Sequence, residues 1–140
     1  TRVRSSAASD VYKRQGLINV NGEFLTLHSK ANLLVYMGHH FFYADKVHDY
    51  KNIDDIERDV MFLACKTNLM CDTLDRIGAN EILLTTQFMA PEAYILESAL
   101  EGWIADEISD SIRFRAAEAY SEYQGCTVKA ALGVFTTSCK

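Results

Sequence analysis

The sequence has a single proline, only seven glycines and no long uninterrupted run of apolar residues. Proline and glycine punctuate turns, so their scarcity over 140 residues argues against a sandwich of many short strands and favours long helices. No apolar run approaches the roughly 20 residues that a membrane-spanning helix needs. The N-terminus also lacks the charged, apolar and small-residue zones of a signal peptide. We therefore predict a cytoplasmic protein that has no membrane partner.

Residues 1–15 (TRVRSSAASDVYKRQ) show no helical or strand periodicity and do not begin with methionine. This string, and DVYKRQ above all, resembles translated sequencing-adapter read-through, a contaminant at the ends of metagenomic contigs. The resemblance covers these residues only, and it implies a disordered, non-native leader that belongs to no domain. We expect residues 16–140 to form a single helical domain, and whether they are a fragment of a longer gene product stays open.

The chain is acidic, with a formal net charge of −5. Residues 1–15 contain four basic residues and one aspartate, so the remainder of the chain carries a net charge of −8. A domain this acidic repels phosphate backbones, which argues against nonspecific binding of DNA or RNA. We therefore expect no nucleic-acid partner.

The four cysteines, Cys65, Cys71, Cys126 and Cys139, show no Cys-x-x-Cys spacing. Cys65 and Cys71 fall six residues apart on an expected helix, so their side chains point in different directions and cannot easily form a disulfide. We predict buried or idle thiols, with a Cys126–Cys139 disulfide as the alternative. None of the four lies in a recognisable catalytic motif.

A β-hairpin is predicted at residues 17–27, where apolar residues flank an Asn-Gly pair that accepts the positive φ angles of a type I′ turn. A first helix is expected over about residues 30–47, because apolar side chains recur there at helical spacing and Ser29 can act as N-cap. A second helix is expected over about residues 54–78. It has acidic residues in its first turn and glycine at its C-cap.

Residues 80–89 fit a short helix or a strand, and we favour a helix because helical patterns flank them. Pro91 suits the first turn of a long amphipathic helix that is expected to reach about Gln124, with Gly125 ending it. Residues 126–135 fit either a strand that joins the hairpin or a frayed tail. The sequence therefore predicts a mainly α protein. It is expected to be a compact three- to four-helix bundle with an N-terminal β-hairpin and, in one version, a C-terminal strand.

Histidines are the first candidates for chemistry, because His39, His40 and His48 fall within ten residues and Asp49 follows directly. One hypothesis is a divalent-metal site that uses His40, His48 and Asp49 as ligands. The alternative is that His40 fills a helix face and the others are solvated. The sequence has no Glu-x-x-His pair, no Gly-x-Ser-x-Gly motif and no glycine-rich phosphate loop, so it predicts no catalytic residue.

An aromatic cluster is the other candidate, since Tyr36, His39, His40 and Tyr43 recur at i, i+3, i+4 and i+7 of the expected first helix. Such a face can pack into the core, contact a partner subunit or stack a planar ligand. Trp103, on the expected long helix, is a further candidate for a ligand or interface contact, because tyrosine and tryptophan are enriched at interfaces.

We expect a non-enzymatic interaction or structural protein that binds a protein partner or itself as a homo-oligomer, without a cofactor. The hypothesis rests on the missing catalytic motifs and on more apolar and aromatic surface than a small bundle needs. The alternative is an enzyme that binds a divalent metal or a small ligand through the region of His39, His40, His48 and Asp49.

Overall fold

The computed structural model describes residues 18–20, 23–25, 31–39 and 56–139. By its contacts the chain divides into two compact units, Thr1–Asn32 and Leu33–Lys140. In the first unit, strands β1 (Ile18–Val20) and β2 (Glu23–Leu25) pair antiparallel, as the Asn-Gly signal between them predicts. The adapter-like leader, residues 1–15, lies outside the described residues.

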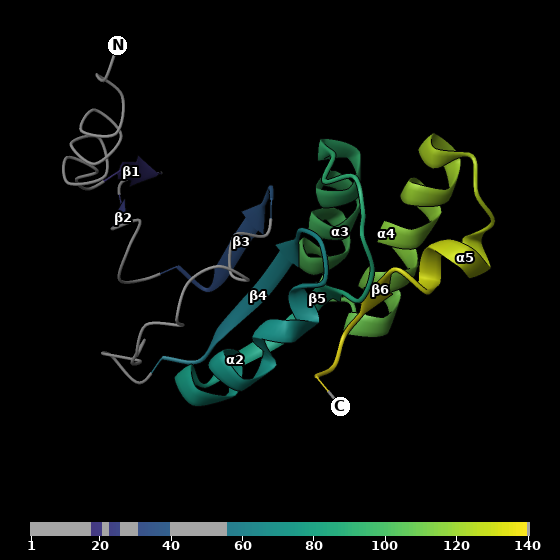
Figure 1. Ribbon diagram of the computed structural model, residues 1–140. Coiled ribbons are helices and arrows are strands. Elements are labelled where there is room, and N and C mark those ends of the chain that lie inside the picture. Colours follow the sequence, from purple (N-terminus) through teal and green to yellow (C-terminus); the bar gives the residue numbers. More distant parts are fainter. Residues whose placement is uncertain (1–17, 21–22, 26–30, 40–55, 140) are drawn as a thin grey trace, which may run out of the picture. The chain divides into compact units, whose positions relative to one another are not determined.

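The second unit contains a mixed four-stranded sheet with the strand order β3-β4-β5-β6 (Figure 1). The first three strands run parallel and the fourth is antiparallel to its neighbour: β3 (Leu33–Met37), β4 (Arg58–Leu63), β5 (Ala79–Thr85) and β6 (Phe135–Thr136). Helices follow β4 and β5: η1 (Thr67–Met70), α2 (Cys71–Ile77), α3 (Ala93–Ile104), α4 (Ser109–Gln124) and α5 (Val128–Leu132). The described residues therefore form an α/β fold, and the mainly α bundle predicted from the sequence is wrong.

Helices cover both faces of the sheet. Val60 and Met61 on β4 are both fully buried, although adjacent residues of a strand point to opposite faces. Met61 packs in the larger core cluster, which includes side chains of α3, α4 and α5, whereas Val60 packs with Met70 and Leu74 of η1 and α2. Figure 1 shows the same layers, with α2 and the α3–α4 pair on different sides of the sheet. Parallel strands are typically buried in this way, because their crossover connections place helices on the faces.

Two of the predicted helices are wrong because strands replace them. Leu33–Met37 is β3 rather than part of a helix over residues 30–47, of which the part beyond residue 39 lies outside the described residues. Arg58–Leu63 is β4 rather than the first half of a long second helix. Both segments are mostly apolar, and periodicity alone does not separate a strand buried on both faces from a buried helix. The predicted C-cap is confirmed, since α2 ends at Gly78, which has φ 62°.

Most of the segment 80–89 also forms a strand where a helix was favoured, since β5 covers Ala79–Thr85. Leu83 and Leu84 of β5 are both fully buried, one in each core cluster, so this strand too is apolar on both faces. The C-terminal strand exists, but it pairs with β5, with Phe135 opposite Thr85, rather than with the hairpin. A five-residue helix, α5, precedes it.

The long helix expected from Pro91 to Gln124 is broken into α3 and α4. Asp106 at the break has φ 57°, and its N–H donates to the Trp103 carbonyl at 3.1 Å. The N–H of Glu107 donates to the Gly102 carbonyl at 3.0 Å, which completes a Schellman motif at the end of α3. Aspartate tolerates the left-handed region better than most residues, so no glycine marks this break in the sequence.

Cys71 and Cys139 form a disulfide, with Cα atoms 5.4 Å apart and a sequence separation of 68 residues. The prediction of idle thiols is wrong for these two residues, and the alternative paired Cys139 with Cys126 instead. Cys65 and Cys71 form no bridge, as predicted, but the helix on which that prediction rested does not exist, because Cys65 lies in the turn after β4. The sequence could not show that β6 brings the C-terminal segment back to α2. No described helix is long and apolar enough to cross a membrane.

Candidate functional site

Cys65 lies two residues after β4, at the carboxyl end of the parallel strands. Its side chain is half-buried and does not take part in the disulfide. The thiol Sγ lies 3.6 Å from the carbonyl oxygen of Met89, in the segment that follows β5. Open α/β sheets bind their ligands outside the carboxyl ends of the strands, so this thiol stands on the side where a ligand is expected.

The turn after Cys65 is sharp. Lys66 has φ 53° and ψ 46°, in the left-handed region that costs a residue with a side chain about 1 kcal/mol. The helix η1 begins at the next residue, and the N–H of Lys66 donates to the carbonyl oxygen of Gln87 at 3.0 Å. The local backbone therefore presents Cys65 at the end of β4.

His39 lies two residues after β3, the strand next to β4, and it is exposed. Met37 is opposite Leu63 in the parallel register, so His39 and Cys65 each follow their strand by the same two residues. The N–H of Gly38 donates to the Leu63 carbonyl at 3.2 Å, which extends the pairing by one residue toward them. Paired strands lie about 4.8 Å apart. His39 and Cys65 therefore follow neighbouring strands at the same edge of the sheet.

This pairing of residue types has a defined chemistry. A thiolate, rather than a thiol, is the nucleophile of cysteine enzymes. An adjacent imidazole activates such a nucleophile by taking its proton. A thiol and an imidazole that meet at this edge would have the chemistry for attack on an acyl carbon.

Of the residues singled out from the sequence for ligand, interface or metal contacts, the structure describes Tyr36, His39 and Trp103. It brings Tyr36 and His39 together, since the Tyr36 hydroxyl donates to the His39 carbonyl oxygen. The Tyr36 ring also packs edge-on against Phe62 of β4, with centroids 6.3 Å apart. Tyr36 and His39 do not share a helix face, because Leu33–Met37 is a strand. The other predicted residues lie outside the described residues: His40, Tyr43, His48 and Asp49.

Trp103 lies on α3, away from this pair. Its indole Nε1 donates to Asp59 Oδ2 at 2.7 Å, and the side-chain amide of Asn80 donates to Asp59 Oδ1 at 2.7 Å. Asp59 is opposite Leu33 at the amino ends of β4 and β3, so Trp103 contacts the end of the sheet opposite to Cys65. These bonds attach α3 to the sheet.

Among the described residues, no group of three or more histidine, cysteine, aspartate and glutamate side chains is arranged to hold a metal ion. The site predicted from His40, His48 and Asp49 falls in the segment that the structure leaves undescribed. A divalent-metal site there stays a prediction.

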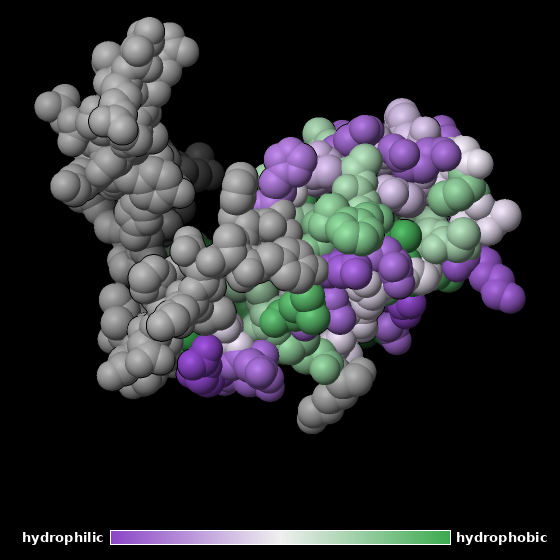
Figure 2. Space-filling model, in the orientation of Figure 1, coloured by the Kyte–Doolittle hydropathy of each residue, from purple (hydrophilic) through white to green (hydrophobic). Residues whose placement is uncertain are grey.

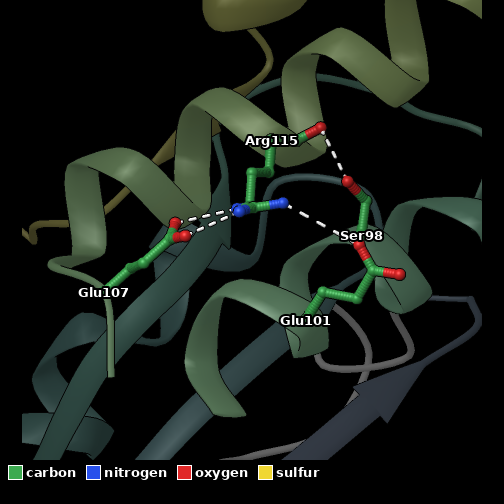
Figure 3. A network of polar contacts seen from close by, with 4 residues as sticks. All are labelled: Ser98, Glu101, Glu107 and Arg115. Atoms are coloured by element: carbon green, nitrogen blue, oxygen red, sulfur yellow. Dashed lines mark hydrogen bonds and ion pairs between the residues drawn. The ribbon is translucent and has the colours of Figure 1, made fainter. Parts of the chain in front are cut away.

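A second polar cluster joins α3 to α4 (Figure 3). Arg115 donates to both carboxylate oxygens of Glu107, at 2.8 and 2.6 Å, and lies 3.8 Å from the carboxylate of Glu101. The Ser98 hydroxyl donates to the backbone carbonyl of Arg115 at 3.2 Å. An open surface pocket of about 490 Å³ lies over this cluster, lined by Glu107, Asp110, Ser111, Phe114, Arg115 and Glu118. Since Arg115 already contacts the carboxylates of Glu107 and Glu101, we infer that the cluster holds α3 and α4 together rather than binding a ligand.

Glu107→Gln is expected to lower the melting temperature at neutral pH. The hydrogen bonds from Arg115 hold the pKa of Glu107 below its usual 4.5, so the ionised carboxylate stabilises the folded state above that pH. The stabilisation is lost as the pH falls through the lowered pKa, and the two proteins should then converge. Melting curves from neutral pH down to about pH 3 test this. Glu122→Gln, at an exposed position of α4, is the control. A difference that stays constant with pH would contradict the expectation.

Gly102→Val is expected to lower the free energy of unfolding by about 2 kcal/mol, as overpacking of a close contact does. Gly102 is buried in α3, and a Cβ there would lie 2.9 Å from Arg115 Cδ and 3.1 Å from Ile112 Cγ1 of α4. Urea unfolding measures the effect. Glu97→Val, which places the same side chain at an exposed position of α3, should change it by no more than about 0.5 kcal/mol. Equal losses in the two variants would show that the α3–α4 approach is not tight.

Comparisons of the chain with protein-family models, with curated proteins and with solved structures give no match in any of the three. The site is therefore argued from the chain's own residues. Sequence reasoning assigned Cys65 no role, because no local motif surrounds it. The signal that could have found it is a pair of apolar runs, residues 33–37 and 60–64, that end before Gly-His and Cys respectively. If the two runs are interpreted as neighbouring parallel strands, these residues follow them at the same edge of the sheet.

Proposed function

We propose that the protein is an enzyme of thiol-dependent acyl transfer, with Cys65 as nucleophile and His39 as general base. The observation that carries the proposal is the parallel register of β3 and β4, which ends with Met37 opposite Leu63. His39 and Cys65 each follow this pair by two residues, so both lie at the carboxyl edge of the sheet. The left-handed Lys66 and the helix that follows it support the proposal, because they turn the chain sharply just after Cys65.

The reaction would run in two halves. His39 takes the proton from the Cys65 thiol, and the thiolate attacks the acyl carbon of an ester, thioester or amide. The bond to the leaving group breaks, the leaving group takes the proton back from the imidazolium, and an S-acyl Cys65 remains. Water then gives a proton to His39 and attacks the thioester, which releases the carboxylic acid and restores the thiol.

The probe that tests this function is p-nitrophenyl acetate, an activated ester that needs no specific binding pocket. The wild-type protein is expected to release a burst of about one equivalent of p-nitrophenolate, as acyl-enzyme accumulates. Cys65→Ala should abolish the burst. Cys126→Ala, which removes another half-buried thiol, is the matched control and should keep it. A burst that survives in Cys65→Ala would overturn the proposal.

Self-association is the second candidate, and the exposed edge of the sheet favours it. Among the described residues β3 pairs only with β4, and its Leu34, Val35 and Met37 are 40%, 40% and 38% exposed. An apolar edge strand is a template for pairing with another chain. On the face drawn in Figure 2, hydrophobic residues lie among hydrophilic ones. A protein partner or a homo-oligomer would use this edge, and light scattering that shows a strict monomer at high concentration would contradict it.

Two further expectations from the sequence are the cytoplasmic location and the divalent-metal site. The Cys71–Cys139 disulfide argues against a cytoplasmic location, because disulfides are rare in compartments that keep thiols reduced. Metal analysis of the purified protein, with thermal shifts on adding zinc, manganese or iron, tests the alternative of a divalent metal bound by His40, His48 and Asp49.

A further inference from the structure

Two threonines behind the Cys65 turn are bonded to each other. Thr67 and Thr85 are fully buried, and buried polar groups need hydrogen-bond partners. The Thr67 N–H donates to Thr85 Oγ1 at 3.1 Å, and the Thr85 N–H donates to Thr67 Oγ1 at 2.9 Å. Thr67 begins η1 and Thr85 ends β5. This reciprocal pair joins β5 to the segment that follows Cys65.

The same two hydroxyls also hold the segment before Cys65. Thr67 Oγ1 donates to the carbonyl oxygen of Phe62 at 2.8 Å, and Thr85 Oγ1 donates to the carbonyl oxygen of Ala64. Each hydroxyl has one proton, so both protons are used by these carbonyls. The 3.1 Å approach of the two hydroxyl oxygens is then a contact without a proton between them. Four hydrogen bonds thus fix the backbone on both sides of Cys65.

We infer that Thr67 and Thr85 are positioning residues for Cys65, an inference that rests on the proposed acyl-transfer function. Neither threonine needs to touch a substrate, since each acts through the backbone of the turn. The Thr85 hydroxyl holds the carbonyl of Ala64, the residue directly before Cys65, and the Thr67 hydroxyl holds the carbonyl of Phe62. Together these bonds set the position of the Cys65 sulfur at the edge of the sheet. A small displacement of a nucleophile slows its attack strongly, so the loss of one hydroxyl should reduce the reaction rate more than it disturbs the fold.

The test compares variants that lose one buried hydroxyl. Thr85→Val keeps the shape of the side chain, and it should slow acylation of Cys65 by p-nitrophenyl acetate about tenfold or more. Thr85→Ser keeps the hydroxyl and should acylate close to the wild-type rate. Thr73→Val removes another buried threonine hydroxyl, on α2, and should leave the rate unchanged. All rates are measured where circular dichroism shows folded protein, and Thr67→Val takes the place of Thr85→Val if that variant does not fold.

The outcomes separate this inference from the function on which it rests. Equal slowing in Thr85→Val and Thr73→Val would show a general loss of rigidity and would overturn it. If wild-type Cys65 is never acylated, the proposed function fails, and the variants are compared by alkylation with iodoacetamide, which needs only a reactive thiol. An alkylation rate at Cys65 that changes in Thr85→Val but not in Thr73→Val supports the positioning role. An unchanged rate in both variants overturns it.

Discussion

Replacing His39 with alanine is expected to slow the acylation of Cys65 by p-nitrophenyl acetate by about 10²- to 10⁴-fold, the range that a general base contributes. The thiol stays in place, but no imidazole takes its proton. His39 is exposed and follows the end of β3, so its removal should leave the melting temperature unchanged. Stopped-flow measurement of the p-nitrophenolate burst gives the rate constant.

Lys129→Ala, which removes an exposed side chain of α5, is the control and should acylate at the wild-type rate. A wild-type rate in His39→Ala would remove His39 from the site and leave Cys65 without its base. An equal loss in both variants would show that the effect does not come from a residue beside Cys65.

Breaking the disulfide is expected to have the largest effect on stability. Cys71→Ser should lower the free energy of unfolding by about 4 kcal/mol, because the bridge closes a loop across a separation of 68 residues and so restricts the unfolded chain. Cys139→Ser should cost the same. The double variant should cost no more than either single one, since all three break the same bond.

Urea unfolding without a reducing agent measures these losses, and Cys126→Ser is the control. A reducing agent should bring the wild-type protein down to the stability of Cys71→Ser. If wild type and Cys71→Ser unfold at the same urea concentration without the reducing agent, the bridge contributes nothing and the C-terminal segment is held by β6 alone.

Local signals in the sequence located the ends of several elements. Strands β1 and β2 flank the Asn-Gly pair, and α2 and α4 end at Gly78 and Gly125, which have φ 62° and 65°. Each of these features depends on the conformational freedom of one or two residues, which can be read without knowing the fold. The three parallel strands depend on contacts between distant segments. Because the sheet buries both faces of β4 and β5, their residues lack the alternation that marks a half-exposed strand. Among the described residues β3 is an edge strand, but its run of apolar residues shows no alternation either.

The candidate site could not be predicted from the sequence, because it also depends on contacts between distant segments. His39 and Cys65 are separated by 26 positions, and no motif covers both. Parallel pairing of β3 and β4 brings them to one edge, and a helical interpretation of the same segments sends them to different places. Trp103, by contrast, was picked for its residue type alone, and the structure assigns it a bond to Asp59 that holds α3.

The most direct test of the account is the position of the acetyl group after reaction with p-nitrophenyl acetate. The reaction is quenched in acid during the burst, the protein is digested, and the acetylated peptide is identified by mass spectrometry. We predict that the acetyl group is on Cys65 and that the peptide carrying Cys126 is unmodified. An acetyl group on Cys126 or on a lysine, with Cys65 unmodified, would contradict the claim that the edge of β3 and β4 is a catalytic site.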